Sequence, residues 1–422
     1  QVFKAGHAWV IPVNQRQFGL AQAMLETRTR FEDNTFYDVS AWNLAMAYNL
    51  PVARLSRLPA TSSESPAMTI STLDPDAVAW VISWQQLNAP AVLQDLLDAG
   101  ATVRASTKPF SIANSSGSED FSEGSLVLLA GLQDKDKAAK IMATLKKADV
   151  SVHSFNSQLT TNGPGLGTSH FKKVSAIKPL LIVGQGTSAY DAGEAWFQLD
   201  RRLGVAPVMV DMSRLKSIDL HDYTHLLMVE GNYANIGKKL KQDITSWVKD
   251  GGILVTIQGA ATWAESLCFK SDGCSENKNG KEEAKKQTNA MAYAEFDDQR
   301  ARRTIGGAIV KAQVDNTHPI TFGYDSEMPI FRRGSTLLKA SENPFATPVR
   351  YTEKPLLSGY IGEQRLGEMS GQPAVIAERQ GKGLVVRFAN NPIFRGFWRG
   401  TERLWVNSLY FGPLVRMTEL PE

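Results

Sequence analysis

Polar side chains that could bind a ligand or take part in catalysis follow three apolar runs in the second half of the chain. The run HLLMVEGNY at 225–233 ends in a carboxylate, an amide and a phenol, GILVTIQGA at 252–260 carries an amide, and GLVVRFANNP at 383–392 ends in amides with an arginine close behind. A carboxylate can act as a general acid or base, and such groups together can hold a polar small molecule or a peptide. The candidate ligand-binding residues are Glu230, Asn232, Tyr233, Gln258, Asn390 and Arg395.

These side chains need strands that bring them to one edge of a sheet. Apolar runs that read as buried strands alternate with segments that read as helices. The expected strands lie at 179–184, 206–210, 225–229, 252–257 and within the run at 383–392, and the expected helices are 191–203 and 238–249. Such alternation indicates a doubly wound, mostly parallel α/β sheet, which places ligands at the carboxyl ends of its strands. We therefore expect the candidate site at that rim.

The first part of the chain contains a repeated pattern. The tetrapeptide AWVI occurs at 8–11 and again at 79–82, and each copy reads as a strand before a helix-like segment. Residues 125–155 read as strand, helix and strand. The Gly- and Pro-rich stretch TTNGPGLGTSHF at 160–171 is typical of a domain boundary. The sequence thus predicts an α/β region of strand-helix units over residues 1–170 and a second domain over residues 176–422.

The groups needed for hydrolytic chemistry are missing from the expected rim. In α/β hydrolases a sharp turn from strand to helix exposes the nucleophile, but the corresponding turn here carries Gln258, Gly259 and Ala260. No HExxH or HxxE sequence occurs, so we expect neither a catalytic residue nor a metal site in this chain. One alternative stays open, a hydrolase that uses Glu230 with Asn232, Tyr233 or Asn390.

Composition excludes several classes of function. The 46 basic and 43 acidic residues nearly cancel, and no basic block is interleaved with aromatic residues, so nucleic acid is not an expected partner. No apolar stretch reaches the roughly 18 residues that a membrane span requires. The first residue, Gln1, is not an initiator methionine, which suggests a processed product or a piece of a longer protein. The two cysteines, Cys268 and Cys274, lie in a polar loop and form either a local disulfide or two free thiols.

Several longer motifs resemble the C-terminal region of large bacterial zinc carboxypeptidase-like proteins. They are FEDNTFYDVSAWNLAMAYNLP at 31–51, GLGTSHF at 165–171, GQGTSAYDAGEAWFQLD at 184–200, WVKDGGILVTIQGAATW at 247–263 and FANNPIFRGFWRGTERLW at 388–405. In that family a metallocarboxypeptidase domain precedes a region that ends in a class I glutamine amidotransferase-like domain of flavodoxin-like type. The resemblance implies that this chain is the accessory region, since the zinc pattern of the peptidase is absent from it.

The same resemblance implies that the amidotransferase-like domain is degenerate. Active members carry a cysteine nucleophile after a buried strand and a histidine base after a late strand. Here Gln258 or Gly259 occupies the first position, and Ala389 or Asn390 occupies the second. Neither an amide nor a glycine can supply a thiolate, so glutamine hydrolysis by the usual route is not expected.

The expected function is therefore that of a noncatalytic module that binds, positions or stabilises. The resemblance implies a bacterial, periplasmic or secreted protein whose partner is the N-terminal carboxypeptidase domain of the same polypeptide. Zinc is expected only in that domain, and no cofactor is expected in residues 1–422.

Overall fold

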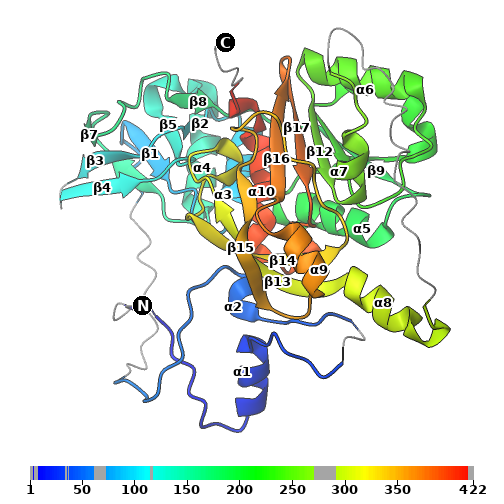
Figure 1. The fold of residues 1–422 in the computed structure, drawn as a ribbon. Helices are drawn as coiled ribbons and strands as arrows, with labels where there is room; N and C mark the ends of the chain where they lie inside the picture. The colour runs from blue at the N-terminus through cyan, green and yellow to red at the C-terminus, as the bar shows by residue number, and fades with distance from the viewer. Residues whose placement is uncertain are drawn as a thin grey trace.

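The computed structural model describes most of the chain (Figure 1). The described residues are 3, 8–33, 36, 38–60, 73–114, 117–269 and 291–416. Within them lie sheets of five, three and nine strands. No helix among the described residues combines the length and the apolar character needed to cross a membrane.

The five-stranded sheet is antiparallel and has the order β6-β1-β5-β2-β8. Its strands are β1 (Ala79–Ile82), β2 (Arg104–Ser106), β5 (Leu126–Leu129), β6 (His153–Phe155) and β8 (Phe171–Lys173). Trp80 and Leu128 pack on the side of helices α3 (Ala89–Asp98) and α4 (Ala138–Lys147). Val81 and Val127 point to the opposite side, because side chains alternate along a strand. There they meet the three-stranded sheet of β3 (Phe110–Asn114), β4 (Gly117–Phe121) and β7 (Thr160–Asn162).

Two strand-helix units build this part of the molecule. The chain runs β1-α3-β2 and later β5-α4-β6, and β5 inserts between β1 and β2, which is the split βαβ arrangement of ferredoxin-like folds. The predicted units at 79–97 and 125–155 are confirmed. The predicted strand at 8–11 is wrong, since this segment has no regular structure and only the helix α1 (Phe18–Leu25) follows it. At 79–82 the same AWVI sequence lies between two partner strands, whereas Trp9 is 77% exposed.

The nine-stranded sheet begins as a parallel, doubly wound sheet. Its parallel strands are β9 (Pro179–Val183), β10 (Val208–Asp211), β11 (His225–Met228), β12 (Ile253–Ile257) and β17 (Gly383–Phe388). They follow one another in the order β10-β9-β11-β12-β17, which is the flavodoxin-like order in which the second strand of the chain lies outside the first. The predicted α/β fold class is confirmed.

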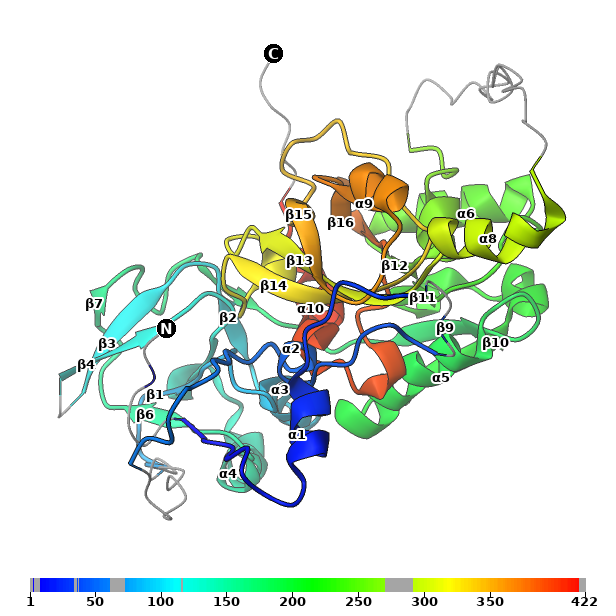
Figure 2. The same cartoon turned by 60° about the horizontal axis from the view of Figure 1, so that its bottom comes forward.

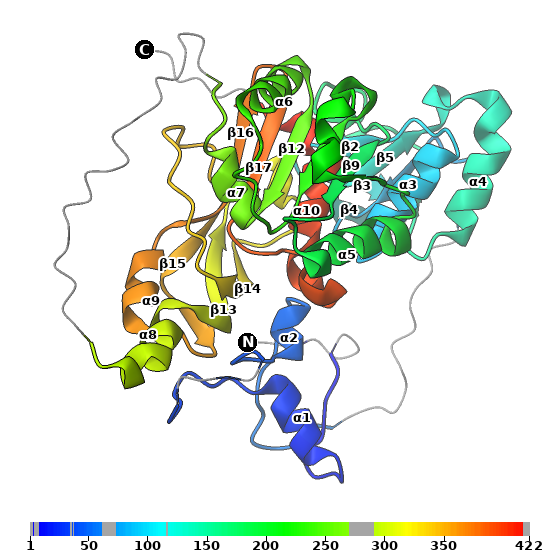
Figure 3. The same cartoon turned by 90° about the vertical axis from the view of Figure 1, so that its right-hand side faces the viewer.

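Helices cover both faces of these parallel strands (Figures 1 and 3). One face packs on α6 (Lys238–Asp250) and α7 (Gly259–Ala264), and the other packs on α5 (Ala189–Phe197) and α10 (Arg399–Tyr410). The sheet then continues with four antiparallel strands in the order β16-β15-β13-β14. These are β16 (Pro373–Gln380), β15 (Val349–Ser358), β13 (Ile305–Val314) and β14 (Glu327–Gly334), with helices α8 (Phe296–Arg303) and α9 (Glu363–Met369) nearby. The sheet is thus parallel in one half and antiparallel in the other.

Two helices, one near each end of the described chain, pack against the sheets and connect them. The short helix α2 (Leu44–Ala47) brings Ala41 and Ala47 against Phe331 and Trp398 of the nine-stranded half. Helix α10 lies between the five-stranded sheet and the parallel strands in the views of Figures 1 and 2. A single continuous hydrophobic core includes residues from both of these sheets.

Asn407 of α10 is the polar centre of that contact. Its Oδ1 accepts a hydrogen bond from the Trp84 indole N–H (2.8 Å), and its Nδ2 donates to the carbonyl oxygens of Ile320 and Phe322 (both 2.9 Å). Trp84 and Asn407 are fully buried. Because none of these groups can reach water, each hydrogen bond matters more than one at the surface.

We predict that Asn407→Ala lowers the free energy of unfolding by about 3 kcal/mol or more, since it leaves a buried N–H and two carbonyls without their partner. Urea denaturation followed by tryptophan fluorescence measures the change. Asn235→Ala, at an exposed position, is the matched control and is expected to change stability by less than about 0.5 kcal/mol. Equal stabilities of the two variants would contradict this account of the contact.

Candidate functional site

The carboxyl ends of the parallel strands form a rim that carries most of the candidate residues. Glu230 follows β11, Gln258 follows β12, and Asn390 and Asn391 follow β17. The segment Gly184–Ser188 follows β9 and meets Gly231 through a bridge at Thr187. The predicted convergence of strand ends is therefore present in the structure.

Gln258 lies on a sharp turn between β12 and α7. Its backbone has φ 51° and ψ −112°, a conformation that is unfavourable for a residue with a side chain. Turns of this kind present the nucleophile in α/β hydrolases. The Gln258 side chain is only 8% exposed, and its Nε2 donates to the Arg333 carbonyl oxygen at 3.1 Å. The turn thus keeps the shape of a nucleophile-bearing turn while its side chain serves as a structural tie to β14.

The Glu230 carboxylate occupies the backbone donors beside this turn. Gly259 donates its N–H to Glu230 Oε2 at 2.7 Å, and the Gly231 N–H also points to the carboxylate. A Cβ on Gly259 would lie 2.7 Å from the Gly231 carbonyl oxygen and 2.9 Å from Glu230 Oε1, so only glycine fits there. Burial raises the pKa of Glu230, the Gly259 N–H opposes the shift, and the negative charge of Asp191 adds to it. The donors that could stabilise an oxyanion are therefore already engaged.

The two asparagines after β17 have different surroundings. Asn390 Oδ1 accepts from Tyr351 Oη (2.9 Å) and Arg332 Nη1 (3.2 Å), in the buried layer under the antiparallel strands. Asn391 Nδ2 instead donates to Asp191 Oδ1 (2.7 Å) and to a carboxylate oxygen of Glu194 (2.5 Å). Asn391 thus joins the acidic side chains of α5 to the strand end.

Glu194 and Asp191 are not among the candidate residues of the sequence analysis, although both lie in the helix expected at 191–203. Ser188 caps α5 by accepting from the Asp191 N–H at 3.4 Å, and its hydroxyl donates to the Asp191 carboxylate. Burial raises the pKa of Glu194 to about 7, the Arg395 backbone N–H opposes this, and the Asp191 charge raises it further. The signal in the sequence is a pair of acidic residues three positions apart near the start of a helix that faces the rim.

Arg395 links the rim to the N-terminal segment. Its guanidinium donates to both carboxylate oxygens of Asp38, at 2.6 and 2.9 Å, and it lies 5.5 Å from the ring centroid of Trp42. This ion pair lowers the pKa of Asp38. Arg395 itself has a left-handed backbone (φ 53°, ψ 21°) that turns its N–H towards Glu194. Figure 2 shows the N-terminal segment (blue) crossing the antiparallel strands, where Ser40 Oγ donates to the Gly307 carbonyl at 2.5 Å.

The remaining predicted residues are engaged elsewhere. Tyr233 is 2% exposed, and its hydroxyl donates to the Val229 carbonyl at 2.8 Å, so the phenol is part of the core below the rim. Asn232 is exposed and accepts from the Ala234 N–H at 3.0 Å, which closes a local turn. No group of three potential metal ligands occurs among the residues that the structure describes. Cys268 is not a free thiol. Cys274 lies outside the described residues, so the predicted choice between a Cys268–Cys274 disulfide and two free thiols lies outside them too.

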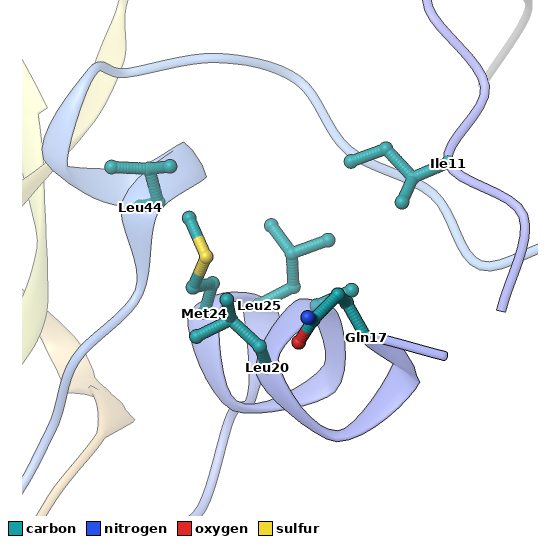
Figure 4. A pocket seen from close by; sticks show the side chains of 7 residues that line it. Ile11, Gln17, Leu20, Met24, Leu25 and Leu44 are labelled. Carbon is teal, nitrogen blue, oxygen red and sulfur yellow. The ribbon is translucent and has the colours of Figure 1, made fainter. Parts of the chain in front are cut away.

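An apolar pocket lies apart from the rim. It has a volume of about 210 Å³ and is formed mainly by α1, with Leu20 and Met24 facing Leu44 and Ile11 (Figure 4). It contains no acidic or basic side chain. Catalysis in this pocket therefore has no support, and the acidic rim remains the candidate functional site.

We predict that Glu194→Gln stabilises the fold at pH 8 by about 2 kcal/mol but has little effect at pH 4. The carboxyl with the higher pKa in the folded state binds more protons there, so wild-type stability falls as the pH rises from 4.5 towards about 7. Glutamine resembles the protonated acid and removes this loss. Urea denaturation at pH 4, 6 and 8 measures the free energy of unfolding of both proteins. Burial also raises the pKa of Glu402 to about 7, so part of the pH dependence of stability stays in the variant. Parallel stability curves for the two proteins would refute the assignment.

Comparison with known proteins gives no family assignment. No protein-family model and no curated protein matches the chain. Among solved structures, the chain is similar to a Thermoplasma acidophilum protein described as part of a GMP synthase, with 11% identity, a TM-score of 0.32, and coverage of 56% of this chain and 94% of that one. A cytoplasmic protein from Salmonella typhimurium, STM3548, has 14% identity and a TM-score of 0.31, covering 55% and 98%. A ThuA-like protein from Bacteroides uniformis has 15% identity and a TM-score of 0.33, covering 55% and 89%. Similarity at this level is too low to transfer a function, and the fold class rests on the strand order itself.

Proposed function

We propose that this chain is a noncatalytic accessory module, the C-terminal portion of a zinc carboxypeptidase-like protein that acts in the periplasm or outside the cell. Its role is to bind, position or stabilise the peptidase domain. The observation that carries the noncatalytic part is the turn at Gln258, where an amide stands in the position of a nucleophile. The parent protein and its location rest on the sequence motifs alone.

The chemistry of a class I amidotransferase requires a thiolate, a base and free backbone donors for the oxyanion. At the rim of this chain the thiolate position holds Gln258, and the end of β17 holds Ala389 and Asn390 in place of a histidine. The Gly259 N–H is bonded to Glu230. Each of the three requirements fails separately, which supports a fold that has kept its shape without the reaction.

The contacts at the rim favour a stabilising role. Asn391, Glu194 and Asp191 bond to one another, and Glu230 bonds to the turn at Gly259. A peptide or polar small molecule at this place must replace those internal hydrogen bonds. Its binding group would have to be a cation or a strong hydrogen-bond donor, because the rim presents carboxylates.

A hydrolase centred on Glu230 is the second candidate. It is favoured by the raised pKa values of Glu230 and Glu194, because a general acid must hold its proton near neutral pH. Against it, the Glu230 carboxylate is held by the Gly259 N–H, and the neighbouring carboxylates of Asp191 and Glu194 are both bonded to Asn391. Burial is the largest cause of both shifts.

We predict that the wild-type chain releases no ammonia from glutamine and that Gln258→Cys does not create this activity. The new thiol would stand on a suitable turn but would lack a base and free oxyanion donors. A coupled glutamate dehydrogenase assay measures ammonia, with Gln258→Ala as the matched control for loss of the amide. Turnover of peptide, amide or ester substrates by the wild type that disappears in Glu230→Gln would instead establish the second candidate.

For the accessory role, we predict that the reading frame upstream of residue 1 encodes HxxE and a later histidine. The full polypeptide should then show peptidase activity that a chelator removes and Gln258→Ala does not change. Deletion of residues 1–422 should lower the thermal midpoint of the peptidase domain or weaken its peptide binding. An upstream frame without these zinc ligands, or a deletion with no effect on either property, would count against the proposal.

A further inference from the structure

A second pocket lies at the opposite end of the parallel strands from the rim. Its volume is about 320 Å³, and it forms where the loop before β11, the end of α6, the start of β12 and the end of α10 come together. The residues that matter for its chemistry are His221, Tyr223, His225, Trp247, Asp250 and Leu409. None of them belongs to the rim.

Two long helices end at this pocket. The 13-residue helix α6 ends at Asp250, and the 12-residue helix α10 ends at Tyr410, just after Leu409. The carbonyl end of a helix carries a partial negative charge of about half a unit. At α10 the carbonyl oxygens of Ser408 and Leu409 face the His225 ring. The ends of these two helices therefore place partial negative charge beside the pocket.

Acidic side chains add to this field. His221 Nδ1 lies 3.2 Å from Asp219 Oδ1, and its Nε2 lies 3.6 Å from Asp250 Oδ2. These two carboxylates raise the pKa of His221, which is the direction expected where positive charge is favoured. His225 does not supply a permanent positive charge, because burial lowers its pKa to about 4. A cation in the pocket would share Asp250 with the exposed His221.

The inner wall of the pocket is apolar. Trp247 and Leu409 are nearly fully buried, and the Trp247 indole N–H donates to the Tyr223 carbonyl oxygen at 3.3 Å, which fixes the ring in place. An apolar wall next to a carboxylate and helix carbonyls suits a group that is hydrocarbon along its length and positive at its tip. A primary alkylammonium chain has this pattern, and its three N–H donors match several oxygen acceptors.

We propose that this pocket binds a primary alkylammonium group, with Asp250 as the ionic partner and the end of α10 beside the ammonium. The group could belong to a free amine or to a lysine side chain of a peptide, since both present the same chemistry. The proposal does not depend on the proposed function, because it uses none of the rim residues.

The test is a titration of the full chain in phosphate buffer, followed by the NMR signals of the Trp247 indole and the His221 ring. The probes are n-butylammonium and Nα-acetyl-lysinamide, with butyrate and n-butanol as charge-reversed and neutral controls. We expect saturable shifts with the ammonium probes alone and an affinity loss of about tenfold in Asp250→Asn. Asp222→Asn, on the same loop but outside the pocket lining, is the matched control and should bind like the wild type.

The two probes separate the sources of the ligand. Binding of the lysinamide alone supports a peptide side chain, and binding of n-butylammonium with exclusion of the bulkier probe supports a free amine. Asp250→Lys, at an exposed position, places a fixed ammonium group where the ligand would bind and should abolish both signals. Equal binding of butyrate or butanol, or unchanged affinity in both Asp250→Asn and Asp250→Lys, would overturn the proposal.

Discussion

The close approach of β11 and β12 at their carboxyl ends controls the chemistry of the rim. A Cβ on Gly259 would lie 2.7 Å from the Gly231 carbonyl oxygen, and the Glu230 carboxylate bonds to the Gly259 N–H. A Cβ on Gly231 would lie 2.6 Å from the Gly186 carbonyl oxygen, in the segment after β9. A strained residue persists only where its neighbours determine its conformation. Gln258 meets that condition, since its N–H is bonded to Phe388 and its side chain to Arg333.

The antiparallel half of the sheet explains why this rim is closed. Arg332 of β14 is buried, and its guanidinium donates to Asn390 Oδ1, to the Ala389 carbonyl and to the Thr336 carbonyl. Tyr351 of β15 bonds to the same Asn390. A buried positive charge that is held by neutral oxygens depends on all of them being present. The antiparallel strands thus hold the end of β17 in place through these hydrogen bonds. A catalytic base at this position would need to be accessible to a substrate.

Sequence reasoning located the parallel half because each buried strand there is a continuous apolar run that ends at a polar turn. It missed β13, β14 and β15, because glycine, proline and charged residues interrupt the apolar pattern of these strands. It could not separate AWVI at 8–11 from AWVI at 79–82, because the difference lies in partner strands that are distant in sequence. At the site it found Glu230 and Gln258, but it could not tell that Tyr233 points into the core or that Asn391 rather than Asn390 meets the acids.

The two ends of the parallel sheet therefore differ in how much a ligand would have to displace. At the rim, Gln258, Asn390 and Asn391 are buried and bonded to protein, so a ligand must break several hydrogen bonds before it gains any. At the opposite end, the Asp250 and His221 side chains are 68% and 63% exposed, and the helix carbonyls already favour positive charge. An incoming cation there displaces water and shares Asp250 with the exposed His221 imidazole. Binding is thus less costly at the amino ends of the strands, although sheets of this architecture usually bind ligands at the carboxyl ends.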